Sequence, residues 1–281
     1  MQIVEPKVET WLNCNTIDHI ARCARVCYAS DKTTGNEGMC TALWANKHRS
    51  MFRHAGVYYI IPERIQISES AYLGAVIKLV GHTYYVSANE QSAREYWNKK
   101  YKKYRISLDE AEHNDIFRKY KLLRYTLCIE TSIDITREFN RKSPNSIAEQ
   151  STRYVDFIKR VGIRFKQCHW MYNMNIWKYC LTRIMLKTSE LFYKIARSKY
   201  GLNLTPQDAR FILPLDTMSK VVYTYTVAEW EYIINMRLWD WTGKAHEDAK
   251  IVAKLIYNEL TKLGYTIINY NKVNELFYNT I

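Results

Sequence analysis

Apolar residues recur at helical spacing near the start of the chain and through most of its second half. Between residues 17 and 28 they return every three or four positions, which predicts an amphipathic helix capped by Thr16 and ended by the loop 30–38. The same criterion predicts helices over five later ranges: 40–52, 133–140, 170–200, 227–238 and 245–263. The second half of the chain is therefore expected to be mainly helical.

Stretches rich in β-branched and aromatic residues predict strands between these helices. Residues 56–61 form one such stretch, ended by Pro62, and residues 125–129 alternate like another. Residues 76–86 have the pattern of a hairpin around Gly81. Strands in the first half and helices in the second indicate an α+β fold.

The remaining local signals concern turns and domain boundaries. Thr205 and Pro206 are suited to the cap and first turn of a short helix, which Pro214 would end. Residues 63–121 are a mixed region outside their hairpin. The chain contains neither an internal repeat nor a flexible linker, so we predict a single domain over 1–281.

Composition adds a charge preference to this picture. The chain has 281 residues, of which 47% are apolar and 25% charged, with nine Gly and five Pro, so a collagen-like or low-complexity protein is excluded. Lysine and arginine outnumber the acidic residues by 41 to 28, giving a net charge of +13. Such a surface favours anionic partners such as nucleotides, phosphorylated cofactors, nucleic acid or an acidic membrane.

Cysteine usage and hydropathy bear on location. The seven cysteines are scattered without a CxxC pair, which is typical of reduced thiols. No run approaches the roughly 20 apolar residues that span a bilayer, and the start of the chain lacks an export signal. We therefore expect a cytoplasmic protein, of a cell or of a virus-infected host, without a membrane partner.

Common catalytic motifs are absent from the sequence. It has no GxGxxG, no phosphate-loop glycines before Gly243-Lys244 and no GxSxG elbow. His48 and His54 lack the spacing and the carboxylate of a helical zinc motif, so no metal site is predicted. His82 and His169, each without partners in the sequence, are interpreted as structural.

Residues 94–105 interleave six basic residues with four aromatic ones. This composition is compatible with single-stranded nucleic acid, because lysine and arginine hold phosphates while aromatic rings stack on bases. It is equally typical of a solvated basic helix face. We favour the helix face and do not expect a nucleic-acid partner, because one short cluster cannot line the groove that such binding requires.

The segment from Arg137 to Tyr154 has the densest polar chemistry. It reads REFNRKSPNSIAEQSTRY and places three arginines, a lysine, two glutamates and three serines around a turn. Guanidinium, hydroxyl and carboxylate groups together can hold a phosphate and the edge of a base. The segment resembles the signature of the flavin-dependent thymidylate synthases, in which Arg-His-Arg is followed after seven residues by a serine and then by x-Arg-Tyr.

Four further blocks resemble the same family in the same order. They are residues 21–28, 50–54, 206–215 and 229–237. The resemblance runs over about residues 15–263 and implies the fold of the thymidylate synthase complementing proteins, a curved mixed sheet flanked by helices. Residues 63–121 resemble an extra hairpin region of larger members.

The resemblance implies an activity and its partners. The family converts dUMP to dTMP with methylenetetrahydrofolate as carbon donor, FAD as hydride carrier and NADPH as reductant. It also implies a homotetramer whose sites lie between subunits. No cysteine nucleophile is required, and Ser151 is interpreted as a binding hydroxyl.

The resemblance assigns roles to individual residues. Arg237 is the catalytic candidate, because its guanidinium can stabilise negative charge on the uracil ring, and it shares a helix face with Trp230 and Ile233. The expected nucleotide-binding residues, with backbone N–H groups around Gln150 assisting at the phosphate, are Glu138, Arg141, Glu149, Gln150, Ser151, Arg153, Arg210 and Arg237. The expected cofactor-binding residues are His54, Gly56, Arg141, Lys142, Ser143, Glu149 and Tyr232. Tyr154 is expected either to stack on a ring or to lie in the core.

The flavin side of the pattern departs from the family. The Arg-His-Arg triplet is replaced by Arg141-Lys142-Ser143, and Thr226, Ala228 and Tyr232 replace the polar residues expected in the last block. Two alternatives to the flavin-dependent synthase therefore remain open. One is a relative that modifies a deoxypyrimidine monophosphate differently, such as by folate-dependent hydroxymethylation of dUMP or dCMP. The other is a nucleic-acid-binding protein on the same scaffold.

Overall fold

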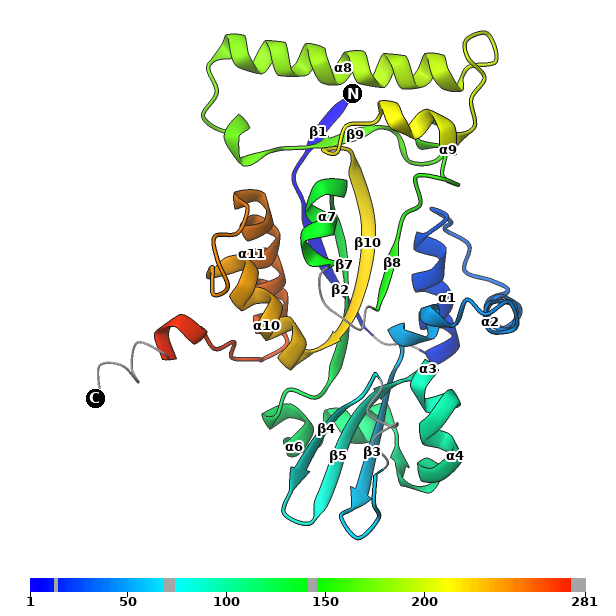
Figure 1. Cartoon of the computed structure of the whole chain (residues 1–281), viewed down its shortest axis with the longest axis vertical. Helices are drawn as coiled ribbons and strands as arrows, with labels where there is room; N and C mark the ends of the chain where they lie inside the picture. Colours follow the sequence, from blue (N-terminus) through cyan, green and yellow to red (C-terminus); the bar gives the residue numbers. More distant parts are fainter. Residues whose placement is uncertain (13–14, 68–73, 141–145, 274–281) are drawn as a thin grey trace.

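A four-stranded antiparallel sheet forms the centre of the molecule (Figure 1). The computed structural model describes residues 1–12, 15–67, 74–140 and 146–273. The sheet order is β2 (Lys7–Trp11), β7 (Arg124–Ser132), β10 (Met218–Thr226) and β8 (Ile147–Glu149). β7 and β10 are buried along nearly their whole length, since helices cover both faces of the sheet.

The two faces of the central sheet bury different helices. α7 (Ile133–Phe139), α10 (Val227–Leu238) and α11 (Glu247–Lys262) pack on one face with the larger apolar core, which contains Leu127 and Tyr223. α1 (Thr16–Val26) packs on the other face, against alternate residues such as Cys128, Ala148 and Val222. Neighbouring residues of one strand therefore face different helices.

A second four-stranded sheet lies at one end of the central sheet (Figure 1). Its order is β4 (Val76–Val80), β5 (Thr83–Asn89), β3 (Gly56–Pro62) and β6 (Arg105–Ile106). The short helices around it are α3 (Glu90–Ser92), a π-helical turn (Ala93–Trp97), α4 (Asn98–Tyr101), a 3-10 turn (Lys102–Tyr104), α5 (Leu108–Glu112) and α6 (Asp115–Lys119).

The basic and aromatic segment 94–105 is part of this second unit and not a surface for bases. Trp97 is fully buried and stacks on Tyr59, with ring centroids 5.4 Å apart. The guanidinium groups of Arg94 and Arg105 both pair with Glu90, at 2.8 and 3.3 Å. Trp97 and Tyr101 therefore supply core, which leaves few aromatic rings for bases and weakens the local argument for a nucleic-acid-binding protein.

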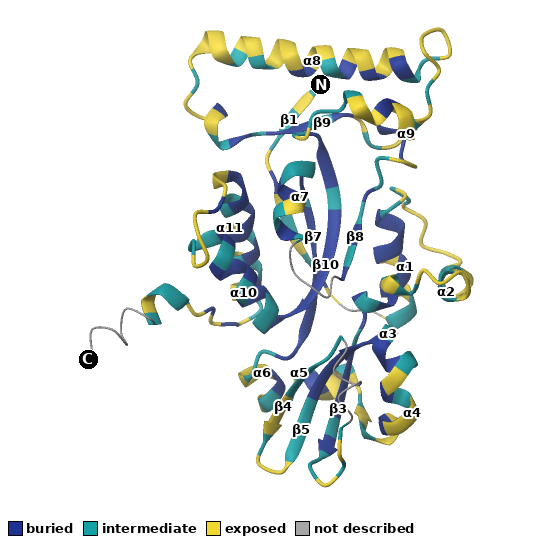
Figure 2. Cartoon of the chain, viewed as in Figure 1, coloured by how far each residue is buried: buried dark blue, intermediate teal, exposed yellow. Residues whose placement is uncertain are grey.

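A long helix, α8 (Ile176–Arg197), lies across the opposite end of the molecule (Figure 1). Beneath it, β1 (Gln2–Val4) pairs in parallel with β9 (Arg164–Lys166). The remaining elements of this end are a π-helical turn (Phe157–Val161), a 3-10 turn (His169–Met171), α9 (Pro206–Ala209) and a second 3-10 turn (Arg210–Ile212). Figure 2 shows that α8 is exposed along most of its outer side.

The α+β class and most of the expected elements are confirmed. The expected cap and first turn of the short helix are present, because Thr205 Oγ1 accepts a hydrogen bond from the Asp208 N–H. The expected strand at 56–61, the hairpin at 76–86 and the helices at 133–140 and 227–238 also form. Within the described residues the central sheet is antiparallel throughout, and the parallel pairing is confined to β1 and β9.

Two boundaries differ from expectation for local reasons. The helix expected over 40–52 is instead α2 (Asn36–Ala45) followed by a 3-10 helix (Arg49–His54). They are separated at Lys47, whose φ of 64° lies in the left-handed region. α1 is capped by the side chain of Asn15, which accepts from the Ile17 N–H, and not by Thr16.

Candidate functional site

Arg237 joins the last turn of α10 to the end of α7. Its Nε and Nη2 donate to the backbone oxygen of Glu138 at 3.1 and 2.7 Å, and its Nη1 lies 3.4 Å from Glu138 Oε2. The last carbonyl oxygens of a helix lack partners within the helix and carry partial negative charge, so a guanidinium is a favourable partner for them. Arg237 is 9% exposed and thus holds its charge in a fixed, nearly buried position.

Glu149 approaches the same helix from β8. Thr136 Oγ1 on α7 donates to Glu149 Oε1 at 2.8 Å, and burial raises the pKa of the Glu149 carboxyl. Tyr223 Oη donates to the backbone oxygen of Thr136 and to Asn140 Oδ1. α7 therefore lies between Arg237 and Glu149, and the predicted residues Glu138 and Glu149 are brought to one region.

A second group forms where β8 ends. The Arg153 N–H donates to Ser151 Oγ at 3.1 Å, and Arg153 Nε donates to Gln207 Oε1 on α9 at 2.9 Å. Arg210 follows α9 and is exposed, as is Arg153. The structure thus brings the serine and arginine turn next to the 206–215 block, as the expected phosphate site requires.

Two of the backbone amides expected to assist at the phosphate are bonded within the chain. The Gln150 N–H donates to the backbone oxygen of Lys220 at 2.8 Å, and the Ser151 N–H donates to that of Cys27 at 3.0 Å. These amides are occupied by the sheet and its neighbouring loop. Tyr154, by contrast, is 60% exposed beside the ring of Tyr28 and is not a core residue.

The described residues expected to contact a flavin do not form an open flavin site within one chain. His54 is fully buried, and its Nδ1 lies 2.8 Å from Thr224 Oγ1. A Cβ atom on Gly56 would meet Tyr58 Oη at 2.8 Å, so the glycine is required by packing. Tyr232 meets the edge of Trp241 with ring centroids 5.7 Å apart. The other expected flavin contacts, Arg141, Lys142 and Ser143, lie outside the described residues.

His54 belongs to a chain of buried hydrogen bonds across the sheet. Thr224 Oγ1 lies 2.6 Å from Thr126 Oγ1, which in turn lies 2.8 Å from His19 Nε2. Burial and the nearby His19 lower the pKa of His54 to about 3. Burial, followed by the charge of Arg22, lowers the pKa of His19 to about 4. Both imidazoles are therefore neutral, and this network joins α1 to the sheet.

A basic cleft on the α1 face was missed by the sequence analysis. Its volume is about 690 Å³, and six of its lining residues are Lys or Arg against three acidic ones: Arg22, Arg25, Lys32, Arg160, Arg164 and Lys220 against Glu9, Asp18 and Asp31. Among the predicted site residues, Gln150 lines this cleft, whereas its neighbour Glu149 faces α7. Most of the cleft is lined by the segment 18–36, and Arg160, Arg164 and Lys220 join it from distant segments.

One protein-family model matches about two thirds of the chain. The family model of the thymidylate synthase complementing protein matches residues 73–263, which is 191 of the 281 residues. The matched range contains every expected nucleotide-binding residue and excludes His54 and Gly56. No curated protein matches the chain.

Similarity to solved structures is more distant. The UMP/dUMP methylase PolB from Streptomyces cacaoi bound with 5-Br dUMP is 14% identical, with a TM-score of 0.45 over 94% of this chain and 93% of that one. Thymidylate Synthase X from Helicobacter pylori with FAD and dUMP is 17% identical, with a TM-score of 0.35 over 60% of this chain and 85% of that one.

In the described residues, no helix is both long and apolar enough to cross a membrane.

Proposed function

Because the chain belongs to the thymidylate synthase complementing protein family, we propose that it transfers a one-carbon group to C5 of a deoxypyrimidine monophosphate. The first candidate is conversion of dUMP to dTMP, with methylenetetrahydrofolate as carbon donor, FAD as hydride carrier and NADPH as reductant. The observation that carries the proposal is the contact between Arg153 and Gln207, 54 positions apart, which unites the two segments expected to hold the phosphate.

The phosphate role follows from charge and access. Arg153 and Arg210 are exposed and lie on adjacent segments, so both guanidinium groups can reach one phosphate. Ser151 Oγ, which accepts from the Arg153 N–H, can still donate its own proton to a phosphate oxygen. Charged hydrogen bonds of this kind contribute about 1.5–3 kcal/mol each.

The ring-activating role falls to Arg237. Uracil C5 must act as the carbon nucleophile, so negative charge has to be stabilised on the N3, C4 and O2 side of the ring. A fixed guanidinium is suited to this, because it needs no reorganisation when the charge develops. The two bonds to the Glu138 backbone oxygen hold the Arg237 head group in place before substrate arrives.

We propose that each site is completed by a second copy of the chain in a homotetramer. Arg237 bonds to α7, whereas Arg153 and Arg210 lie by α9, at the end of the molecule under α8 (Figure 1). The outer side of α8 offers a surface for such a copy, since eight large apolar side chains are exposed there: Ile176, Trp177, Leu181, Ile184, Met185, Leu191, Phe192 and Ile195. Exposed apolar surface of this extent marks an interface.

A second candidate is hydroxymethylation. Methylation of C5 by methylenetetrahydrofolate needs a two-electron reductant, whereas addition of the methylene group and water gives a hydroxymethyl group and tetrahydrofolate without one. The specific observation in its favour is that His54, Gly56 and Tyr232 are all engaged in packing or internal hydrogen bonds.

One assay separates the candidates. Purified protein is incubated with dUMP or dCMP and methylenetetrahydrofolate, with and without NADPH and FAD, and the nucleotide product is identified by mass spectrometry. A methyl product that requires NADPH and FAD supports the synthase. A hydroxymethyl product formed without them supports the second candidate, and an unmodified nucleotide under all conditions contradicts both.

A further inference from the structure

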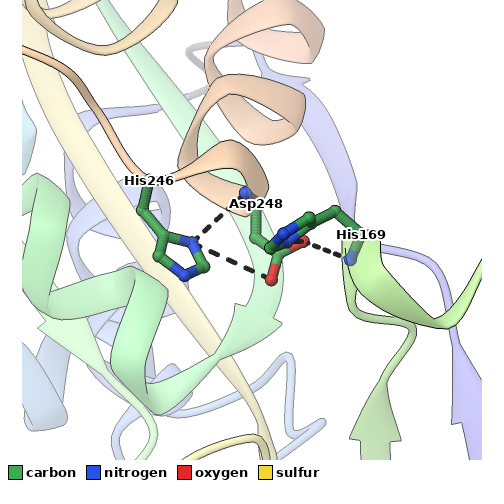
Figure 3. A group of neighbouring side chains, drawn as sticks. All are labelled: His169, His246 and Asp248. Atoms are coloured by element: carbon green, nitrogen blue, oxygen red, sulfur yellow. Dashed lines mark hydrogen bonds and ion pairs between the residues drawn. The ribbon is translucent and has the colours of Figure 1, made fainter.

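Two neighbouring residues, His246 and Asp248, meet His169 from a distant segment at the start of α11 (Figure 3). His246 caps this helix, Asp248 lies in its first turn, and His169 belongs to the 3-10 turn that precedes α8. One ligand atom from each residue lies within 4.8 Å of the other two. We propose that His169, His246 and Asp248 bind one divalent transition-metal ion of the zinc type.

The separations are those of a site that needs only small adjustments. Asp248 Oδ1 lies 3.2 Å from His169 Nδ1, and Asp248 Oδ2 lies 3.9 Å from His246 Nδ1. Neighbouring ligands of a tetrahedral ion with bonds of about 2.0–2.2 Å are roughly 3.4 Å apart. The first pair is already near this spacing. The second distance is to the other carboxylate oxygen and is about half an ångström longer, so the His246 imidazole must turn toward the ion.

The two histidines are free enough to make that adjustment. Their side chains are 37% and 51% exposed, whereas Asp248 is 3% exposed. The imidazoles can therefore rotate toward an ion held on the buried carboxylate, and water can occupy the fourth position. Their rings meet edge to face with centroids 5.5 Å apart, so both can approach the same carboxylate without colliding.

The surrounding charges favour a divalent cation. The buried Lys166 ammonium lies 2.7 Å from Asp248 Oδ2, 3.6 Å from Asp134 Oδ2 and 3.9 Å from Asp216 Oδ1. One positive side chain therefore faces three carboxyl groups in this cluster. Lys166 keeps Asp134 and Asp216 as partners if the ion takes part of Asp248.

The donor set also selects the kind of metal. Two imidazoles and one carboxylate suit Zn²⁺, Co²⁺ or Ni²⁺, whereas Mg²⁺ and Ca²⁺ prefer oxygen ligands alone. Lys166 and the backbone N–H of His169, which donates to Asp248 Oδ1 at 2.6 Å, would orient the carboxylate from outside the metal shell. The nearby Cys168 thiol is directed to Asp216 Oδ1 at 3.5 Å and is not part of the set.

Such an ion would connect two parts of the fold. His169 lies in the segment between β9 and α8, and α11 packs on the central core. An ion bound between them would tie the end of the molecule that carries α8 to the central sheet. Because it would bind the folded chain and not the unfolded one, it would raise the thermal midpoint of unfolding.

The test is a Zn²⁺ titration of the full chain after treatment with EDTA, followed by isothermal calorimetry. We expect one ion per chain, and at least roughly tenfold weaker binding in His169→Ala and in His246→Asn, because each removes one ligand. Asparagine at 246 retains a side-chain oxygen for the helix cap, so the variant should stay folded. Circular dichroism checks the fold of each variant.

Matched controls and a spectroscopic measurement complete the experiment. His82→Ala and His113→Ala also remove an exposed histidine beside a carboxylate, at sites elsewhere in the molecule, and should leave Zn²⁺ binding unchanged. Co²⁺ should give the visible bands of a tetrahedral site in the parent chain and lose them in the His169→Ala, His246→Asn double variant. The proposal is overturned if the parent chain binds no stoichiometric ion, or if that double variant binds as tightly as the parent.

Discussion

Arg237 Nη2 donates to the backbone oxygen of Glu138 at 2.7 Å, although the two residues are 99 positions apart. The bond joins the ends of α10 and α7, which pack on the same face of the central sheet. An arginine placed for surface solubility would not be 9% exposed and doubly bonded to a helix end. The arrangement instead fits a guanidinium whose position is fixed before substrate binds.

We expect Arg237→Ala to lower turnover strongly while the protein stays folded. Loss of one preorganised donor to the reacting group lowers kcat by about a hundredfold to a thousandfold. Arg118→Ala is the matched control, because Arg118 Nη2 also donates to a backbone oxygen, that of Leu263, far from the site. Steady-state kinetics give the rates and circular dichroism reports the fold. Near-normal turnover of Arg237→Ala would remove this residue from the mechanism.

The phosphate assignment predicts a different kinetic signature. Arg153→Ala and Arg210→Ala should each weaken dUMP binding by roughly tenfold to a hundredfold, since each removes a charged hydrogen bond to the phosphate. Binding of deoxyuridine, which lacks the phosphate, should not change. Arg64→Ala, which removes another exposed arginine, is the control. Calorimetric titration with dUMP and with deoxyuridine gives both affinities. Equal losses of affinity for the two ligands would argue against a phosphate role.

The buried histidines predict a loss of stability in mild acid. The pKa of His54 is lowered to about 3 and that of His19 to about 4, mainly by burial, while the unfolded chain has histidine pKa values near about 6.5. The depressed pKa values mean that the unfolded chain binds protons first as the pH falls. The free energy of unfolding should therefore be constant above pH ~7 and decrease below it, by up to about 1.4 kcal/mol per pH unit for each histidine.

Urea unfolding between pH 7 and pH 5 measures this decrease. His54→Asn should make the pH dependence shallower by up to one proton, because it removes one of the two buried imidazoles. His113→Asn, at an exposed histidine, should leave the slope as it was. If the free energy of unfolding of the parent chain increased as the pH falls from 7 to 5, the burial of these two histidines would be contradicted.

Local signals predicted the elements that local contacts determine. Thr205 caps its short helix through a bond to the Asp208 N–H three positions on, and this is visible in the sequence. β10 was not predicted, although Met218–Thr226 is rich in β-branched and aromatic residues, and the strand is buried on both faces. The lysines around Trp97 are exposed, as expected of a solvated basic face, whereas Trp97 and Tyr101 are buried. Tertiary packing, and not the local pattern, decides which side of a short helix is buried.

The parts of the site that lie in continuous sequence blocks could be predicted, whereas groups formed by residues far apart in sequence could not. The turn at Ser151 and the block around Arg210 could be assigned from a resemblance, and the Arg153 to Gln207 contact brings them together. The His169 and Asp248 pair is separated by 79 positions, so no spacing rule could have found it. Long-range convergence of this kind becomes visible only in the folded chain.

The exposed apolar side of α8 predicts the oligomeric state. Leu181→Glu combined with Phe192→Glu places two charges on this surface and should convert the assembly to smaller species, because both residues are more than half exposed in the single chain. Lys187→Glu, an exposed position of the same helix, is the control. Light scattering after size-exclusion chromatography gives the masses. A parent chain that is monomeric at micromolar concentration would refute both the interface and the shared site.

Sites shared between subunits make one further prediction, which uses the roles proposed for Arg237 and Arg153. If Arg237 and Arg153 of one site come from different chains, then Arg237→Ala and Arg153→Ala proteins, assayed at a dUMP concentration well below that which saturates the Arg153→Ala protein, have little activity separately but complement each other when mixed and reassembled. Random assembly gives both native residues to about a quarter of the sites, so roughly a quarter of the parent activity should return. If each site takes both residues from one chain, mixing restores nothing, because every chain lacks one of them. Activity of equimolar mixtures after dissociation and reassembly, compared with each variant treated alone, distinguishes the two arrangements.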